Sequence, residues 1–347
     1  MNQTLNGIRR ILITILVAMG VGALFIVAIG ENPIDAYAAL FRGAFDGELR
    51  LGTTLAGFTP LLLTSIAFAV AAKAGAFNVG VEGEVFLGGI TAAYIGINWT
   101  FLPKPALYVA CFVGAMVVAA AWAFIPAILR AYYNVNEVCT TILMNTVALY
   151  ITSYLVSGPM SAGTANAQSL PVTVRLYQFM KPSSVNVGIF IAAITVIVVI
   201  FMLQKSSWGY KIRTVGLNPT HADYVGIDSK KVFVGAMMLS GMLGGMAGCI
   251  EVLGVHGYFL NNFATGLGSN GMLAALIVKN NMVSTPFMAF FLAVLKSGAM
   301  GMQQSTGVPK SLVDTITAVF IIIATMETAF QFTKKRKKKT EKKEDKA

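Results

Sequence analysis

Long apolar runs recur along this chain, and they restrict its fold more than any other feature. The run 187–203 is almost wholly apolar, and the run 232–255 carries a single charged residue, Glu251. A bilayer core of ~30 Å is crossed by about 20 helical residues. Hydrophobic residues make up 56% of the 347 residues and charged residues only 12%, and a soluble fold cannot bury that much apolar surface. We therefore predict an all-α, polytopic membrane protein.

About ten transmembrane helices are predicted when this length is laid along the sequence. Their expected positions are 11–29, 52–72, 77–97, 106–129, 137–156, 187–203, 232–255, 268–283, 286–303 and 311–331. In the crowded regions 52–97 and 268–303, a broken or re-entrant helix fits the sequence equally well. The first run has no clear cleavage site, so it is expected to be a retained helix.

The distribution of charge predicts that both termini are cytoplasmic. With Arg9 and Arg10 inside, the polar segment 204–231 and the basic tail 334–347 fall on the same side, as the positive-inside rule requires. The tail follows a transmembrane domain predicted over 1–333. It is expected to be disordered and to contact anionic lipid rather than nucleic acid, because no aromatic residue is interleaved with its charges.

The opposite side receives the acidic residues between the first two predicted helices and the long segment 157–186. That segment is rich in Ser, Gly, Pro and Asn, which is typical of a solvated external loop. It is therefore predicted to be such a loop.

The cytoplasmic segment 204–231 carries signals for a short helix of its own. Asn218 is suited to cap that helix, Pro219 to its first position and Gly226 to its end. A connection between membrane helices needs only a few solvated residues, so a separately capped helix predicts a docking element for a partner.

Small residues are concentrated within the predicted helices. The pattern in MLSGMLGGMAG predicts close helix packing at Gly241, Gly244, Gly245 and Gly248. The cysteines lie in apolar runs without metal-ligand spacing, so we expect no metal and predict core positions for Cys111, Cys139 and Cys249. The two histidines are isolated and are expected at the surface: His221 and His256.

The segment 75–84, GAFNVGVEGE, places two carboxylates and an amide beside three glycines within the membrane. A carboxylate facing lipid is costly, and glycines permit a helix break of the kind found at transporter sites. The candidate residues of a solute pathway are Phe77, Asn78, Glu82 and Asn145. Two alternatives stay open: Glu82 and Glu84 also suit a helix N-terminus, and Asn145 either joins helices or contacts a polar solute.

No nucleophile–base pair and no GxxxxGK[ST] phosphate loop is visible in the sequence. We therefore expect a non-catalytic protein without a cofactor, in which any ATP hydrolysis belongs to another chain. A secondary transporter driven by protons or sodium through Glu82 or Glu251 is one rival. A membrane-embedded enzyme or scaffold is another, although it would need a convergent catalytic set.

Several motifs resemble the permease subunits of bacterial ABC importers for branched-chain amino acids, ribose-like sugars and nucleosides. They are AGAFNVGVEGE, NEVCTTILMN and GYKIRTVGLNPTHADYVGI, followed by GGMAG. FNVGVEGE is more similar to the nucleoside and simple-sugar permeases than to the others. The chain departs from the family at Ser269-Asn270, where an aromatic–acidic pair is usual, and near Lys279, where a more basic residue is usual.

The resemblance implies a vitamin-B12-importer-like (type II) fold of about ten helices in two related halves. Two permease subunits, often non-identical, would sit over two ATPase subunits in the bacterial cell membrane. An extracellular lipoprotein or binding protein would deliver a nucleoside, or alternatively a ribose-like sugar or another small solute, for transport by alternating access.

By the same likeness, the segment 209–227 is the coupling loop that enters a groove on the ATPase. Tyr210, Tyr224 and Val225 are expected to fill the groove, with Lys211, Arg213 and Asp223 at its rim. The coupling residues so implied are Gly209, Tyr210, Arg213, Gly216, Asn218, Pro219, Asp223, Tyr224 and Gly226.

Overall fold

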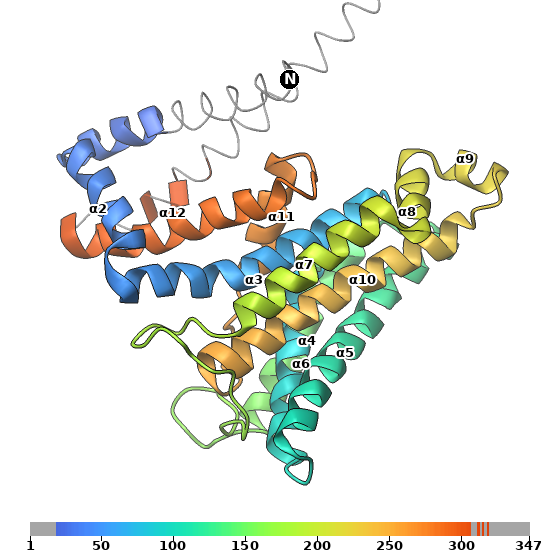
Figure 1. Ribbon diagram of the computed structural model, residues 1–347, viewed down its shortest axis with the longest axis horizontal. Helices are drawn as coiled ribbons and strands as arrows, with labels where there is room; N and C mark the ends of the chain where they lie inside the picture. Colours follow the sequence, from blue (N-terminus) through green and yellow to red (C-terminus); the bar gives the residue numbers. More distant parts are fainter. Residues whose placement is uncertain (1–18, 307–310, 313, 316–317, 319–347) are drawn as a thin grey trace, which may run out of the picture. The chain divides into compact units, whose positions relative to one another are not determined.

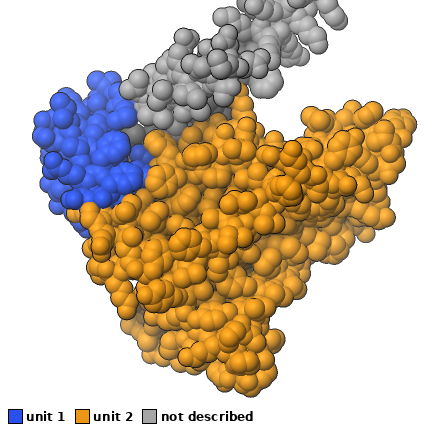
Figure 2. Space-filling view, viewed as in Figure 1, with its two compact units in different colours: residues 1–46, 294–347 blue, residues 47–293 orange. Residues whose placement is uncertain are grey.

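The computed structural model describes residues 19–306, together with 311, 312, 314, 315 and 318. Within this part of the chain every regular element is a helix, and the β-structure consists of isolated bridges (Figure 1). The predicted all-α class is therefore confirmed. The chain divides into two compact units, residues 1–46 with 294–347 and residues 47–293, which Figure 2 colours separately. The predicted basic tail 334–347 lies outside the described residues.

In the first unit, the helix Met19–Ala28 is followed by α2, Pro33–Phe45, at a bend of 116°. Asn32 caps α2 by accepting a hydrogen bond from the backbone N–H of Ile34 at 3.0 Å. The helix α2 was not predicted, because its acidic residues were interpreted as an external connection. Its buried face packs in a small apolar core with the last turns of α12: Ile26, Ala36, Leu40, Ala299 and Met302.

The second unit holds the remaining helices in a closely packed bundle (Figure 1). In chain order they are α3 (Gly47–Lys73), α4 (Val81–Asn98), α5 (Lys104–Tyr133), α6 (Glu137–Ser157), α7 (Gly188–Lys205), α8 (Ser207–Leu217), α9 (Pro219–Tyr224), α10 (Ser229–Ile250) with the π-helix Glu251–His256, and α11 (Leu267–Ile277). The helix α12, Thr285–Thr306, begins in this unit and passes the boundary at Val294.

Among the described residues, six helices are long and apolar enough to cross a membrane, or seven if the bent pair in the first unit is one span. They are α3, α5, α6, α7, α10 with its π-helix, and α12, and each overlaps a predicted span. The helix α4 matches the prediction 77–97 but begins at Val81. The predicted spans 11–29 and 311–331 lie partly or mostly outside the described residues, so the count of ten stays a prediction.

The predicted span 268–283 is wrong as a continuous helix. The helix α11 has 11 residues and ends at Ile277, and residues 278–284, which follow it, are not helical. Lys279 and Asn280 adopt positive φ angles of 57° and 55°, which an α-helix does not accommodate. The structure therefore favours the broken-helix alternative in this region.

The helix α10 lies against α3, α4 and α5, and its small residues allow these close contacts. A Cβ at Gly241 would lie 2.7 Å from the carbonyl oxygen of Ala119 on α5. Cβ atoms at Gly245 and Gly248 would collide with the α5 and α4 backbones. The predicted close packing is confirmed, and it follows from backbone approach that a side chain would prevent. Cys111 and Cys249 are buried as predicted, whereas Cys139 on α6 is exposed, contrary to the prediction.

The segment 158–187 forms no helix and many of its residues are exposed, which agrees with the loop predicted over 157–186, but part of it is anchored to the bundle. Val172, Val174 and Leu176 are buried while the residues between them are exposed, as in an extended strand on a packed surface. The backbone N–H of Leu176 donates to the carbonyl of Leu253 in the π-helix at 2.9 Å. The composition indicated a loop, but alternate side chains anchor it.

The π-helix at the end of α10 was also not predicted. Its carbonyls are capped from the segment 158–187: Gln178 Nε2 donates to Gly254 at 2.9 Å, and the Arg175 guanidinium donates to His256 at 3.2 Å. His256 stacks edge-on against Phe263 and lies 3.6 Å from the carboxylate of Glu251. The expectation that His256 is a surface residue is therefore wrong.

Candidate functional site

Buried polar side chains meet where α4 begins. Asn78 and Glu84 are each 1% exposed and Ser240 on α10 is 0% exposed, so their polar atoms depend on one another. Asn78 Nδ2 donates to Glu84 Oε1 at 2.8 Å and to Ser240 Oγ at 2.9 Å. Asn78 Oδ1 accepts from the backbone N–H of Gly80 at 2.9 Å. The second carboxyl oxygen, Glu84 Oε2, is buried without a hydrogen-bond partner among the described residues.

Asn145 holds the same helix start from α6. Its Oδ1 accepts from the backbone N–H of Gly83 at 2.8 Å, and its Nδ2 donates to the carbonyl of Val79 at 2.9 Å. Gly83 is needed here, because a Cβ would lie 2.9 Å from Asn145 Oδ1. Of the two alternatives for Asn145, joining helices is therefore the role that its contacts show.

Glu82 points away from this buried group and toward α11. Its Oε2 accepts a hydrogen bond from Ser269 Oγ at 3.3 Å, and a Cβ at Gly268 would lie 2.7 Å from the Cβ of Glu82. Phe77 packs edge-on against Phe68, with ring centroids 5.0 Å apart. The structure thus places the predicted pathway residues around the start of α4, with Glu82 the more accessible of its two carboxylates.

The chain between the π-helix and α11 runs beside α4 without forming a helix. Val172, near the C-terminal end of α4, donates its backbone N–H to the carbonyl of Gly257. Phe263 packs edge-on against Phe86, with ring centroids 5.7 Å apart, and Gly268 reaches Glu82. The start of α11 therefore meets the start of α4 inside the bundle. Helices that begin within the membrane are a recurrent arrangement at transporter sites.

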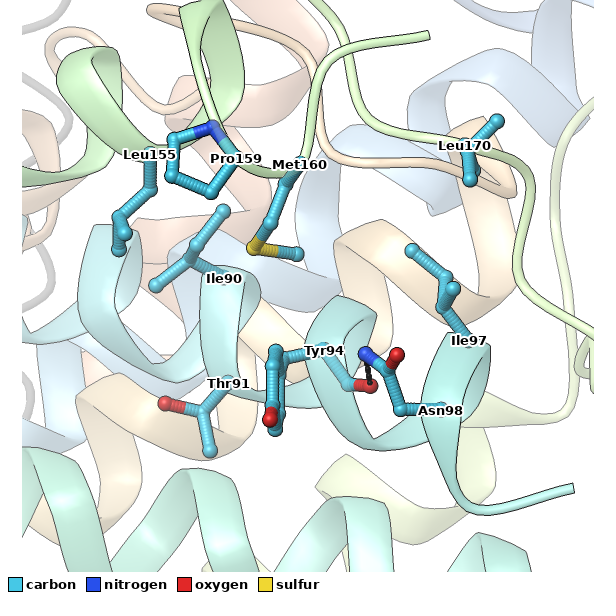
Figure 3. A pocket seen from close by; sticks show the side chains of 9 residues that line it. All are labelled: Ile90, Thr91, Tyr94, Ile97, Asn98, Leu155, Pro159, Met160 and Leu170. Carbon is cyan, nitrogen blue, oxygen red and sulfur yellow. Dashed lines mark hydrogen bonds between the residues drawn. The ribbon is translucent and has the colours of Figure 1, made fainter.

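At the other end of α4, a hollow of about 420 Å³ opens between α4, the end of α6 and the segment 158–187. Figure 3 shows Tyr94 and Thr91 on its floor, with Leu155, Met160 and Leu170 around it. Asn98 Nδ2 donates to the carbonyl of Tyr94 at 2.9 Å. The walls are mostly apolar with a few hydroxyl and amide groups, which is typical of a pocket for a small organic molecule.

The predicted cytoplasmic helix is present as a pair, α8 and α9, between α7 and α10. Asn218 caps α9 through the N–H of His221 at 3.0 Å, Pro219 is its first residue, and Gly226 has a φ of 81° just after its end. These three predictions are confirmed. The first helix of the pair was not predicted as a separate element, although Ser206 caps it through the N–H of Gly209 at 3.0 Å.

Several predicted coupling residues hold the shape of this pair. Gly209 packs on the backbone of Leu203, and Gly216 packs on the backbone of Lys73. The Arg213 guanidinium donates to the carbonyl of Leu203 at the end of α7. The carboxylate of Asp223 accepts from the backbone N–H and the hydroxyl of Ser229, each at 3.0 Å. Asp223 and Arg213 are thus occupied by internal bonds rather than freely presented at a rim.

Other side chains of the pair are directed outward and make a surface that is apolar and aromatic. Leu217 is 88% exposed and Tyr224 is 86% exposed. Tyr210 and Val225 are also exposed. We call these four residues the coupling surface. Tyr210, Tyr224 and Val225 were expected to fill a docking groove, whereas Leu217 was not predicted, and all four are exposed where a partner can reach them.

Comparison with known proteins gives one family. Residues 50–325 match the family described as branched-chain amino acid transport system / permease component. The guanosine ABC transporter permease protein NupP of Bacillus subtilis is 33% identical over 337 residues, covering 94% of this chain and 96% of that protein. No solved structure matches the chain significantly.

Two further relatives show similar identity and coverage. The glucose ABC transporter permease protein TsgB13 of Haloferax volcanii is 32% identical, covering 89% of this chain and 85% of that protein. The nucleoside ABC transporter permease protein NupB of Lactococcus lactis is 31% identical, covering 92% of this chain and 91% of that protein.

Proposed function

The chain belongs to the permease family of branched-chain amino acid transport systems, and from this premise we propose that it carries nucleosides into the cell as the membrane subunit of an ATP-driven importer. It is an ABC transporter permease and a multi-pass protein of the cell membrane. The ATPase, a second permease subunit and an extracellular binding lipoprotein are the partners that this function requires.

The observation that carries the proposal is the coupling surface on its separately capped helices. Leu217 and Tyr224 are almost fully exposed, although Gly216, Arg213 and Asp223 tie the same segment to α3, α7 and α10. Exposed aromatic and aliphatic side chains on a rigid support are typical of the centre of a protein interface. Because the sequence has no phosphate loop, ATP would be hydrolysed by the partner that binds there.

A nucleoside is the proposed solute because two of the three relatives described above are named as guanosine or nucleoside permeases. The third is named as a glucose permease, so a sugar is the alternative. A ribonucleoside shares polyol chemistry with a sugar and adds a flat heterocycle, which suits a mostly apolar path with few polar groups.

Transport would follow alternating access. Nucleotide-driven movement of the ATPase would displace α8 and α9, and that movement would reach α10 and change the packing around the start of α4. Both termini and the coupling surface would face the cytoplasm, and the segment 158–187 would face the outside. Solute would enter from that outer face, after delivery by the binding lipoprotein.

The proposal is tested by reconstituting the chain in vesicles with its proposed partners, an ATPase, a second permease subunit and a binding lipoprotein. We expect labelled guanosine to accumulate only with ATP, and excess unlabelled nucleoside to compete while glucose does not. Competition by glucose alone would make the alternative solute correct. Accumulation on a proton or sodium gradient without ATP would instead support the rival secondary transporter.

A further inference from the structure

The helix α10 connects the coupling segment with the buried polar group at the start of α4. At its first turn, Ser229 is bonded twice to Asp223 of α9, and Asp228 caps the helix through the N–H of Lys231 at 3.0 Å. Ser240 lies about 16 Å further along the same helix, at 1.5 Å per residue. An uninterrupted helix therefore joins α9 to Ser240, and a displacement of α9 would be carried along it.

At Ser240 the connection passes to Asn78 by side-chain hydrogen bonds. The Asn78 amide has two N–H groups, and it donates one to Ser240 and one to Glu84. Its oxygen accepts from Gly80, the residue before α4. The amide thus uses both of its donors and one acceptor position to join α10 with the first turn of α4.

Elsewhere glycines of α10 make several of its close contacts with α4. Gly245 faces Gly88, Gly248 faces the carbonyl of Val85, and Gly244 faces the Glu84 side chain. Packed helices shift by small sliding movements, and backbone contacts between glycines offer little interlocking to resist them. Among the described residues, the hydrogen bond of Asn78 to Ser240 is the side-chain hydrogen bond that joins α10 with the start of α4.

We propose that Asn78, Glu84 and Ser240 form a coupling hub through which movement of α10 positions the start of α4, and that Glu84 Oε2 gains its missing partner in the other state of the cycle. The inference rests on the proposed function. A buried acceptor without a partner is costly, and such a cost is retained where two arrangements alternate. The movement would reach α6 through Asn145 and α11 through the contact between Glu82 and Ser269.

The test uses the complete reconstituted complex and measures guanosine uptake, ATP hydrolysis and their ratio. Asn78→Asp removes both donors and places a second carboxyl against Glu84, so uptake per ATP should fall about tenfold while the ATPase stays bound. Glu84→Gln keeps one acceptor oxygen, so its uptake per ATP should fall no more than about threefold. The double variant Asn78→Asp with Glu84→Gln exchanges donor and acceptor, and should recover most of the wild-type ratio.

Ser65 supplies the control for Ser240. Both hydroxyls are fully buried, but in the described part of the chain that of Ser65 donates to the carbonyl of Leu62 in its own helix, at 2.9 Å, and not to another helix. Ser240→Ala should lower uptake per ATP several-fold, and Ser65→Ala should leave it unchanged.

Three results would overturn the hub: an unchanged ratio in Asn78→Asp and Ser240→Ala, no recovery in the double variant, or uptake and hydrolysis lost together because the complex does not assemble. A wild-type complex without ATP-dependent uptake would overturn the proposed function and the hub with it. Uptake by the wild type with unaffected variants would overturn the hub alone.

Discussion

At the residue scale, two asparagines organise the start of α4 by bonding to the backbone. Asn78 accepts from Gly80, and Asn145 bonds to Val79 and Gly83 from a different helix. The first N–H groups of a helix have no partner within it, and at a helix start buried in the protein, such as Gly80 and Gly83, bulk water does not supply one. These amides supply some of the missing partners, which explains why polar residues stand in an apolar stretch.

Asn145→Ala should destabilise the protein by about 1–3 kcal/mol, because the Val79 carbonyl and the Gly83 N–H would lose their partner. Asn98→Ala is the matched control, since Asn98 is exposed and its amide bonds within its own helix. Thermal unfolding of the purified protein in detergent measures both. Equal shifts in the two variants would show that Asn145 does not hold α4.

Asp228 gives the coupling end of α10 a defined dependence on pH. The hydrogen bond from the backbone N–H of Lys231 is the largest cause that lowers the pKa of its carboxyl from the ordinary 3.8. A lowered pKa in the folded state means that the stabilisation is present above about pH 4 and is lost as the pH falls through the lowered value.

We therefore expect the Tm of Asp228→Asn to lie below that of the wild type by a constant amount between about pH 5 and 8. The two curves of Tm against pH should converge as the pH falls below 3.8. Curves that stay parallel through the acid range would show that the charge of Asp228 contributes nothing to the cap.

At the scale of elements, α10 is both a tightly packed helix and the continuation of the coupling segment. Its glycine face admits the backbones of α4 and α5, while Ser229 joins it to α9. Close packing through glycines would let the helix stay near its neighbours if it shifts, which is the property that the proposed alternating access requires of it.

Gly248→Ala should lower stability by about 1–3 kcal/mol, because its Cβ would collide with the carbonyl of Val85 and overpacking forces the backbone to move. Gly57→Ala on α3 is the control, since nothing lies within 4 Å of a Cβ built there. Unfolding of both variants in detergent gives the comparison. A tolerated Gly248→Ala would mean that α10 and α4 are less closely packed than described.

The sequence predicts the elements that local chemistry determines. Asn218, Pro219 and Gly226 mark α9 because capping depends on a few neighbouring residues. The segment 158–187 and the π-helix depend instead on contacts between distant parts of the chain, such as Gln178 with Gly254. Composition alone therefore did not show how the segment 158–187 is anchored. Hydropathy alone predicted a span over 268–283, which is longer than α11.

At the scale of the whole molecule, the site was predicted better by position than by role. Asn78, Glu82 and Asn145 were expected near the solute path, and they do converge at the start of α4. Glu84 was missed as a buried partner of Asn78, because the hydrogen bonds of Asn78 to Glu84 and to Ser240 of α10 are not visible in sequence spacing. Metal-free, cofactor-free action stays a prediction, as do the count of ten helices and the type II fold.

Docking and folding can be separated on the coupling surface. Tyr224→Ala removes an exposed side chain, so binding of the ATPase should weaken about tenfold or more with no change in Tm. Asp223→Ala breaks the bonds to Ser229 and should lower both Tm and binding. Co-purification of the ATPase and thermal unfolding give the two readouts. Normal binding by Tyr224→Ala would place the ATPase elsewhere.

The central claim is that this permease is driven by ATP through α8 and α9. It is tested most directly by guanosine accumulation in vesicles that contain the full complex, with ATP inside, with and without ionophores, in the wild type and in Tyr224→Ala. We predict accumulation that needs ATP, resists the ionophores and is lost in Tyr224→Ala. Accumulation that the ionophores abolish, and that continues without ATP or with Tyr224→Ala, would contradict it.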